Sequence, residues 1–283
     1  NNLSGCFPSG FFELCDKSYN FSGNPNLAGG ISFTSYCTNG DGGDEDNDGY
    51  CQALGDCDDD DASKFPNNIE ICDLKDNNCN NLIDDIASPQ TNTWIAGSGD
   101  WDVPTNWSLG MIPLRCQNVV INGANGIQVT VQSDTCVARS ITVQSGKTLF
   151  IASSGVLTIN HGLNIVNQGS IINNGNIVVN NILTSSLFGI NNTGSITNQS
   201  SGSIFIQNSG ERSFSNNMGG ILTNNGNITI DRHVNNTAST GLYNFGVVTN
   251  NAELTVRNIL GNQIRIAPGS TFTNQMNGTV IVE

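Results

Sequence analysis

The sequence predicts an all-β protein: a parallel β-solenoid of about 25 residues per coil, preceded by a small disulfide-rich calcium-binding module. Three observations support this fold class. Apolar residues recur at a long, regular period in the C-terminal half, acidic residues cluster in one short segment, and all nine cysteines lie in the first half. We divide the chain into an N-terminal Cys-containing segment (1–40), an acidic module (41–87), a Trp-rich cap or linker (88–114) and the solenoid (115–283).

The N-terminal segment, residues 1–40, is rich in Gly, Asn and Ser and contains three cysteines. It is too short to bury a core alone. Residues 31–36 alternate between apolar and polar side chains, as a strand does, and we expect this stretch to serve as an assembly arm. The chain starts at Asn1 without an apolar leader, which is typical of a mature protein after removal of a signal peptide.

The negative charge of the chain is concentrated in the acidic module. Residues 41–85 contain fifteen Asp or Glu and two Lys, which accounts for −13 of the formal net charge of −14. So dense a charge would repel nucleic acid and requires neutralisation by hard cations. Copper and zinc are disfavoured, because the only histidines, His161 and His233, lie far from these acids in the sequence.

The first candidate calcium loop begins at Asp44 and has Gly49 at its sixth position. An EF-hand loop would close with Glu at position twelve, but Gly55 stands there, so closure is expected from two later carboxylates. The predicted ligands are Asp44, Asp46, Asp48, the backbone carbonyl of Tyr50, Asp56 and Asp58.

The second candidate loop repeats this spacing, with Asn81 where Gly is usual. Its predicted ligands are Asp76, Asn78, Asn80, the backbone carbonyl of Leu82, and Asp84. We therefore expect at least two Ca²⁺ ions. The alternative is a solvated acidic linker, although a linker has no reason to repeat ligand spacing.

The acidic segment resembles a known family. Its successive elements are Asp48-Gly49-Tyr50, Asp56-Cys57-Asp58-Asp59, Pro66, Glu70-Ile71-Cys72-Asp73, Asp76-Asn77-Asn78-Cys79-Asn80 and Asp84. Over about 45 residues this order is similar to the MopE-type metal-binding repeat of secreted bacterial proteins. Asn81 departs from the Gly of the family pattern. The family name carries an association with copper, but the segment lacks His, so the resemblance implies calcium here.

The cysteines have the spacing of a disulfide framework, which predicts an oxidising, extracellular location. Cys51, Cys57, Cys72 and Cys79 alternate with the acidic loops and are candidates for locking them. Cys116 and Cys136 are candidates for a staple between adjacent coils. Because nine is odd, at least one thiol is free or bridges to another chain. The sequence contains no run of eighteen apolar residues, so we expect no membrane span.

All three tryptophans, Trp94, Trp101 and Trp107, lie in the segment 88–114. The residues Gly97 to Trp101, Asn106-Trp107 and Gly110 to Pro113 resemble an element that precedes β-solenoids in bacterial surface proteins. The resemblance implies a cap over the apolar residues and free strand edges of the first coil.

Residues 115–283 contain two interleaved Gly-x-apolar series. The apolar positions form three columns: Ile171, Ile196, Leu222, Val248 and Phe272; Ile177, Ile204, Ile228, Leu254 and Val280; Val179, Ile206, Ile230, Val256 and Val282. Each period therefore holds at least two short strands that stack on the next period, as in a β-solenoid.

A column of asparagines accompanies these strands. Its members are Asn173, Asn198, Asn224, Asn250 and Asn274. Stacked amides can hydrogen-bond from coil to coil. The alternative reads Asn174-Gly175 and Asn225-Gly226 as hairpin turns of an antiparallel sandwich, but hairpins do not require matched columns at one period.

These features favour a secreted structural protein, a calcium-stabilised subunit of an extracellular filament, sheath or surface layer. We expect head-to-tail self-association, because the final coil at 278–283 is as regular as the others and no cap follows it. The alternatives are a cell-surface adhesin that binds an extracellular glycan and, less favoured, a β-helix enzyme that degrades polysaccharides.

Catalytic residues for such an enzyme would be charged groups on a third, irregular side of the coils. The candidates are Glu211, Arg212, Asp231, Arg232, His233 and Arg257. Stacked opposite charges are more often surface ion pairs. No nucleophile elbow, phosphate loop or HExxH motif occurs, so we expect no enzyme activity.

Overall fold

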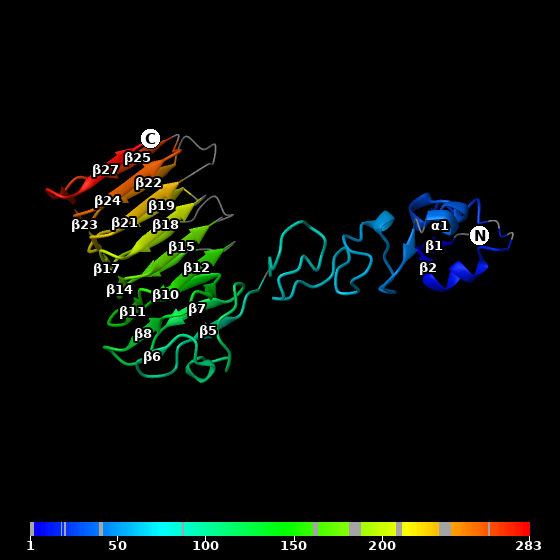
Figure 1. Cartoon of the computed structure of the whole chain (residues 1–283), viewed down its shortest axis with the longest axis horizontal. Helices are drawn as coiled ribbons and strands as arrows, with labels where there is room; N and C mark the ends of the chain where they lie inside the picture. Colours follow the sequence, from blue (N-terminus) through cyan, green and yellow to red (C-terminus); the bar gives the residue numbers. More distant parts are fainter. Residues whose placement is uncertain are drawn as a thin grey trace. The chain divides into compact units, whose positions relative to one another are not determined.

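The computed structural model describes residues 3–17, 19, 21–39, 42–86, 88–160, 164–180, 188–207, 211–231, 239–259 and 261–283. The chain forms two compact units, Asn1–Ala87 and Ser88–Glu283. Figure 1 shows three-sided stacking of strands in the second unit and short elements joined by loops in the first.

The first unit contains few regular elements. Its strands form two parallel pairs, β1 (Ser4–Gly5) with β3 (Asn26–Leu27) and β2 (Phe7–Pro8) with β4 (Gly43–Asp44). Its helices are α1 (Phe33–Asn39) and the 3₁₀ turns η1 (Ser9–Leu14), η2 (Ala28–Gly30) and η3 (Gln52–Leu54).

The N-terminal segment has a core of its own, contrary to the expectation from its length. The core consists of the buried residues Phe7, Leu27, Ala28, Phe33 and Tyr36. Disulfides Cys6–Cys51 and Cys15–Cys37 brace it. Because disulfides restrict the unfolded chain, a core this small can be sufficient.

The strand expected at residues 31–36 is wrong, since α1 begins at Phe33. Phe33 and Tyr36 are three residues apart, so a helix places both on one face. Their rings stack with centroids 5.8 Å apart and both contact Phe7. The segment is thus packed into its own unit, and the expectation that residues 31–36 have no core is wrong. Its role as an assembly arm stays a prediction.

The second unit is a parallel β-solenoid with three sheets, which confirms the predicted fold class. The first sheet contains β5 (Thr91–Thr93), β7 (Asn118–Ile121), β10 (Ser140–Val143), β13 (Ile165–Asn167), β16 (Phe188–Asn192), β19 (Arg212–Asn216), β22 (Thr240–Asn244) and β25 (Asn262–Ile266). The second contains β6 (Gly99–Asp100), β8 (Gln128–Val131), β11 (Thr148–Ile151), β14 (Ser170–Asn173), β17 (Ser195–Asn198), β20 (Ile221–Asn224), β23 (Val247–Asn250) and β26 (Thr271–Asn274). The third contains β9 (Cys136–Ala138), β12 (Val156–Asn160), β15 (Asn176–Asn180), β18 (Ser203–Gln207), β21 (Asn227–Asp231), β24 (Glu253–Arg257) and β27 (Thr279–Val282).

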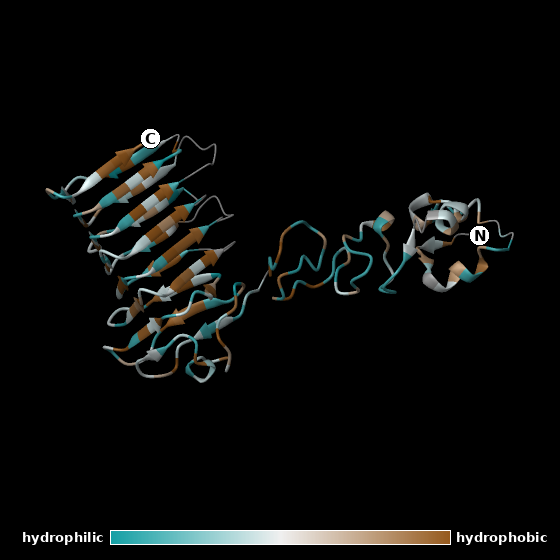
Figure 2. Ribbon diagram, viewed as in Figure 1, coloured by the Kyte–Doolittle hydropathy of each residue, from teal (hydrophilic) through white to brown (hydrophobic). Residues whose placement is uncertain are grey.

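Each strand pairs in parallel with the strand one coil later, so the antiparallel sandwich is wrong. Along β14, β17, β20, β23 and β26 the first residues follow one another at intervals of 25, 26, 26 and 24. The side of the coils that was expected to be irregular is the regular first sheet, from β5 to β25. Along β15 and β18 of the third sheet, buried side chains alternate with more exposed ones, and Figure 2 shows hydrophobic residues repeated on the stacked strands.

The predicted apolar columns are confirmed by the strand register. Ile171 pairs with Ile196, which pairs with Leu222 in the next coil. The glycines that precede several strands have a steric reason. A Cβ on Gly194 would lie 2.1 Å from the carbonyl oxygen of Gly169, and a Cβ on Gly246 would lie 2.1 Å from that of Gly220. Any other residue would push adjacent coils apart.

The predicted asparagine ladder is also confirmed. The Asn173 amide donates to Oδ1 of Asn198 at 2.8 Å, and the same bond continues through Asn224, Asn250 and Asn274 at 2.8–2.9 Å. A second ladder, not predicted, ends the strands of the first sheet: Asn167, Asn192, Asn216 and Asn244, each linked at 2.8 Å. Both ladders are buried apart from the exposed Asn274, so each buried amide replaces hydrogen bonds that water would otherwise make.

The tryptophan segment belongs to the solenoid unit, where it supplies β5, β6 and the 3₁₀ turn η4 (Pro104–Asn106). Trp94, Trp101 and Trp107 are at most 1% exposed. The Trp107 ring makes edge contacts with the other two, with centroids 4.9 and 4.7 Å away. The sheets therefore begin at Thr91, before the segment assigned to the solenoid from sequence.

The staple proposed between Cys116 and Cys136 does not exist. Cys136 has a free thiol that is 1% exposed, while Cys116 is disulfide-bonded. Burial raises the pKa of the Cys136 thiol to about 12. The odd cysteine is thus buried inside the coils and unavailable for a covalent link between chains. None of the described helices has the length and apolar character needed to cross a membrane.

Candidate metal site

The first acidic loop is held at both ends by the N-terminal segment. Asp44 lies in β4, where it pairs with Pro8 of β2. Cys51, directly after the loop, is bonded to Cys6. The N-terminal core therefore provides a rigid base for a loop that has little apolar content of its own.

Backbone N–H groups orient the carboxylates of the first loop. Gly49 donates to Oδ2 of Asp44 at 3.1 Å. Asp48 donates to Oδ1 of Asp46 at 3.1 Å, and Tyr50 donates to Oδ1 of Asp48 at 2.8 Å. Each of these three carboxylates, at loop positions one, three and five, thus accepts a hydrogen bond from a backbone N–H two or five residues later.

The second loop has the same hydrogen-bond pattern. Asn81 donates to Oδ2 of Asp76 at 2.6 Å, and Asn80 donates to its Oδ1 at 3.1 Å. Asn80 N–H also lies 3.1 Å from Oδ1 of Asn78, and Leu82 donates to Oδ1 of Asn80 at 2.7 Å. The spacing read from the sequence therefore corresponds to a repeated three-dimensional motif.

Backbone conformation extends the equivalence of the two loops. Positions four and six have positive φ in both: Asn47 (66°) and Gly49 (98°) in the first, Cys79 (57°) and Asn81 (68°) in the second. Asn tolerates this left-handed region better than most residues. The replacement of Gly by Asn81 is therefore compatible with the loop.

Three carboxylates of the first loop converge, and a fourth, that of Asp56, lies near enough to interact with them electrostatically. One oxygen from each of Asp44, Asp46 and Asp48 lies within 4.8 Å of the other two. Asp56 is 4% exposed and belongs to the same electrostatic group. Within the described residues, one buried oxygen of each has no hydrogen-bond partner: Asp44 Oδ1, Asp46 Oδ2, Asp48 Oδ2 and Asp56 Oδ2. Buried anionic oxygens without partners are costly, and a cation would satisfy all four.

The electrostatics of this group fit a cation site. Burial raises the pKa of Asp46, Asp48 and Asp56, and repulsion from neighbouring carboxylates raises it further. For Asp46 the neighbours include Asp48, Asp44 and Asp61. Backbone N–H donors oppose the shift in each case. The fold thus holds the acids together against their mutual repulsion.

Asp58, expected as a closing ligand, is placed differently. Its carboxylate pairs with Lys64 at 2.5 Å, and this contact raises the pKa of Lys64. Asp61 is bonded to Lys75 at 2.6 Å, which lowers its pKa. The two lysines of the module therefore neutralise acids beside the loop, and of the two expected closing residues Asp56 is the one without a lysine partner among the described residues.

Sequence analysis missed Glu70 as a candidate ligand. Its Oε1 accepts a bond from the backbone of Asn78 at 2.9 Å, while its buried Oε2 has no partner within the described part of the chain. Asp84, which was predicted, accepts bonds from the N–H groups of Asp73 and Leu74 at 3.1 and 3.0 Å. Glu70 belongs to the motif quoted above, but it precedes the second loop in the sequence, so the spacing within the loop did not suggest it as a ligand.

Sulfur ligation is excluded at the position where cysteines approach the acids. Asp56 lies beside Cys57 and Cys79, whose sulfur atoms are within 4.8 Å of its carboxylate. These two cysteines form a disulfide, so neither is a thiolate able to bind a soft metal. Cys72 is disulfide-bonded as well. The donors offered by the loops are therefore oxygen atoms.

The charged residues considered for catalysis are scattered or paired. Arg257 contacts Asp231 at 2.8 Å, and Asp231 is 4% exposed. Arg212 packs on aromatic rings, and Glu211 directly precedes it in the chain. Arg232 and His233, like His161, lie outside the described residues.

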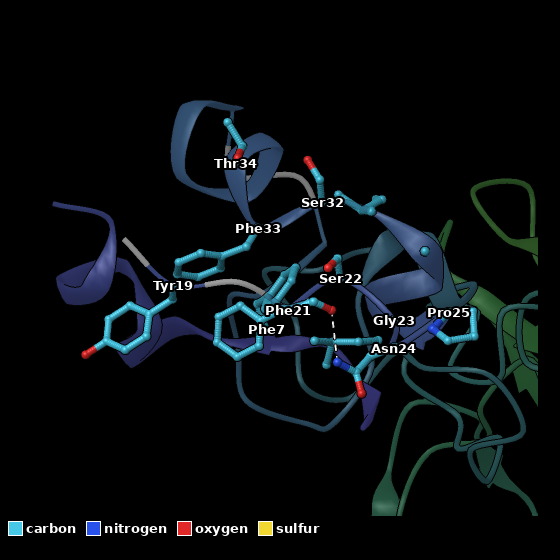
Figure 3. A pocket seen from close by; sticks show the side chains of 13 residues that line it. Phe7, Tyr19, Phe21, Ser22, Gly23, Asn24, Pro25, Ser32, Phe33 and Thr34 are labelled. Atoms are coloured by element: carbon cyan, nitrogen blue, oxygen red, sulfur yellow. Dashed lines mark hydrogen bonds between the residues drawn. The ribbon is translucent and has the colours of Figure 1, made fainter. Parts of the chain in front are cut away.

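A pocket of about 470 Å³ in the first unit is separate from the acidic loops. It is lined by Phe7, Tyr19, Phe21, Phe33 and neighbouring uncharged residues (Figure 3). The amide of Asn24, at its edge, donates to the carbonyl of Phe21 at 2.9 Å. No carboxylate is among the described residues that line this pocket, and none of the cation-site acids is one of them.

Comparison with known proteins identifies one segment. The Cu-binding MopE family model, whose description reads "Putative metal-binding motif", matches residues 56–85. This confirms the resemblance inferred from the sequence and covers the second loop together with Asp56 and Glu70. No curated protein and no solved structure matches the chain. The motif, the disulfides and the β-solenoid fold fit a secreted surface protein.

Proposed function

We propose that the protein is a secreted structural protein whose acidic module is stabilised by Ca²⁺, and that it acts as a subunit of an extracellular filament, sheath or surface layer. The observation that carries the proposal is the convergence of Asp44, Asp46 and Asp48, beside Asp56. Each of the four has a buried oxygen that has no partner among the described residues. A folded module with such a cluster needs a cation.

Calcium fits the donors better than other metals. Carboxylate, amide and carbonyl oxygens are hard ligands, and loops with ligands at alternate residues suit the large, flexible coordination sphere of Ca²⁺. Neither loop offers a His, and the nearby sulfur atoms are in a disulfide. The MopE name suggests copper, but copper would require nitrogen or thiolate ligands.

The solenoid supports a mechanical role. Its parallel sheets are continuous across consecutive coils, and two buried amide ladders cross-link those coils. Such stacking gives a stiff rod in which each coil contacts only its neighbours. Disulfides and bound cations would protect the module outside the cell, where both are available.

A calcium titration tests the metal assignment. Thermal unfolding and proteolysis of the full chain are followed in Ca²⁺, in Mg²⁺ and in EDTA. Calcium should raise the midpoint for residues 1–87 and slow their cleavage, because it binds only the folded loops. Magnesium should do so weakly, since it prefers a smaller, octahedral site. Equal behaviour in all three solutions would exclude the calcium site.

Electron microscopy and light scattering of the calcium-loaded protein test the assembly role. Ordered polymers support a filament, sheath or layer. A monomer at all concentrations would exclude self-association and leave the calcium site standing, so the two parts of the proposal fail separately.

Glycan binding is a second candidate function. The observation that favours it is a group of arginine and aromatic side chains on the first sheet of the solenoid, remote in sequence from the acidic module.

A further inference from the structure

Four side chains form an alternating aromatic and cationic column along the first sheet. Phe188, Arg212, Tyr243 and Arg265 come from the consecutive strands β16, β19, β22 and β25. The Arg212 guanidinium lies 5.5 Å from the centre of the Phe188 ring and 4.1 Å from that of Tyr243. Arg265 approaches Tyr243 from the next strand, at 5.1 Å. We call these four residues the arginine–aromatic column.

The two arginines carry charge that no carboxylate neutralises. Within the part of the chain that the structure describes, Arg212 and Arg265 make no ion pair, whereas Arg257 is bonded to Asp231. Arg265 is exposed and Arg212 is half-buried. Their guanidinium edges therefore offer hydrogen-bond donors to a ligand while their faces pack against the rings.

Polar and aromatic residues lie beside the column. Asn191, which is half-buried, and Ser215, which is buried, hold the positions that precede Tyr243 in register on β16 and β19, and the exposed Glu211 directly precedes Arg212. Phe245 makes an edge contact with Tyr243, with centroids 4.4 Å apart, and is 38% exposed. Cationic, aromatic and amide or hydroxyl groups thus lie together on a strip parallel to the coil stack.

We propose that the arginine–aromatic column binds a linear acidic polysaccharide, a polymer of sugars that carry carboxylates. Guanidinium groups pair with carboxylates in a two-pronged geometry. Arg212 aligns through Thr240 with Asn262, three residues before Arg265 on β25, so the two arginine backbones are about 14 Å apart. The two arginines can therefore contact two charges of one extended polymer, while the exposed Phe245 ring packs against the apolar face of a sugar.

A polysaccharide is favoured over a nucleic acid by the rest of the chain. Residues 41–85 carry a formal charge of −13, which repels a densely charged polyanion. A uronate polymer has one charge per sugar and neutral hydroxyls between charges. This inference deepens the second candidate function, glycan binding, and does not depend on calcium in the acidic loops.

A purely structural role for the column predicts a different outcome. Cation–π contacts between coils would stabilise the stack without any ligand. Under that interpretation, loss of an arginine lowers thermal stability and the intact protein has no affinity for acidic glycans.

The test is binding of the full chain to immobilised polygalacturonate, in EDTA, at low and at high NaCl. We expect binding that weakens with salt, little binding to neutral dextran, and an affinity loss of about tenfold or more for Arg212→Gln and for Arg265→Gln. Arg139→Gln, on an earlier coil, should bind as the parent does. Circular dichroism and melting checks that each variant is folded.

Several results would overturn the inference. They are absence of binding by the parent protein, equal binding to dextran, tighter binding to single-stranded DNA than to polygalacturonate, or unchanged affinity in the folded double variant Arg212→Gln/Arg265→Gln. The calcium titration described above is independent of all four.

Discussion

Gly49 and Asn81 occupy equivalent positions in the two acidic loops. Both have positive φ, 98° and 68°, and both donate a backbone N–H to the first carboxylate of their loop, Asp44 and Asp76. The equivalence shows that the second loop adopts the conformation of the first although it lacks Gly at this position. It also makes the residue at this position a sensitive test of the loop.

The Asn81 position should accept Gly and reject β-branched residues. Asn81→Gly keeps the left-handed conformation without strain and should leave calcium affinity within a few-fold of the parent. Asn81→Val should weaken it at least about tenfold, because a β-branched side chain strains the backbone at positive φ. Leu82→Val is the matched control, since Leu82 has no positive φ. Isothermal titration calorimetry measures each affinity, and equal effects of the two Val substitutions would refute the assignment.

Single ligand removals in the first loop should reproduce chelation. Asp46→Ala and Asp48→Ala each remove one oxygen of the converging group. We expect each to weaken calcium binding at least tenfold, or about 1.4 kcal/mol, and to lower the calcium-dependent rise in melting temperature. Asp134→Ala, in the solenoid, should leave both unchanged. Calcium titrations followed by differential scanning calorimetry measure the effect, and parent-like curves for both loop variants would count against the site.

Substitutions in the solenoid should show that the apolar columns contribute more to stability than a single rung of the amide ladder. Ile228 is 1% exposed between Ile204 and Leu254, so Ile228→Asp buries an unpaired charge and should cost several kcal/mol. Asn224→Ala removes one rung of the ladder and should cost on the order of 1–2 kcal/mol. Thr229→Asp, whose side chain points to the opposite face of the same strand, should be the mildest. Urea unfolding monitored by circular dichroism ranks them, and a different order would contradict the assigned faces.

Cys136 should be inert in the folded protein. Its thiol is 1% exposed and burial raises its pKa from 9.0 to about 12, so little thiolate is present near pH 8. A thiol reagent should label the native chain very slowly and label one cysteine per chain in denaturant without reductant. Rapid native labelling would contradict the burial.

The same pKa shift gives a pH dependence. The folded pKa lies above the ordinary value, so the buried thiol favours the folded state fully below pH 9.0, and this contribution falls as pH rises from 9.0 toward about 12. Cys136→Ser is not a suitable comparison, because a buried hydroxyl without a hydrogen-bond partner would itself lower the stability of the folded state. Cys136→Ala, which removes the titrating group, should flatten this part of the stability profile measured by urea unfolding.

The sequence alone determined the features that depend on periodicity and on local spacing. The columns beginning at Ile171 and Ile177 and the ladder beginning at Asn173 were correctly predicted, because stacked coils need like residues at nearly constant intervals. The loop positions from Asp44 and Asp76 were recognisable for a similar reason: alternate residues of a tight turn point to one side. In each case the physical constraint acts over a few residues or repeats at a fixed period.

Tertiary structure decided what depends on long-range packing. The ladder from Asn167 to Asn244 escaped detection because its intervals, 25, 24 and 28, vary as the coils differ in length. The residues from Phe33 form a helix because Phe7 packs against the face that carries Phe33 and Tyr36, and six residues of alternation could not reveal that partner. Glu70 approaches the second loop, Asp58 turns to Lys64 and Cys136 is buried without a disulfide for the same reason: each outcome depends on which distant residue comes near, and sequence spacing does not encode that.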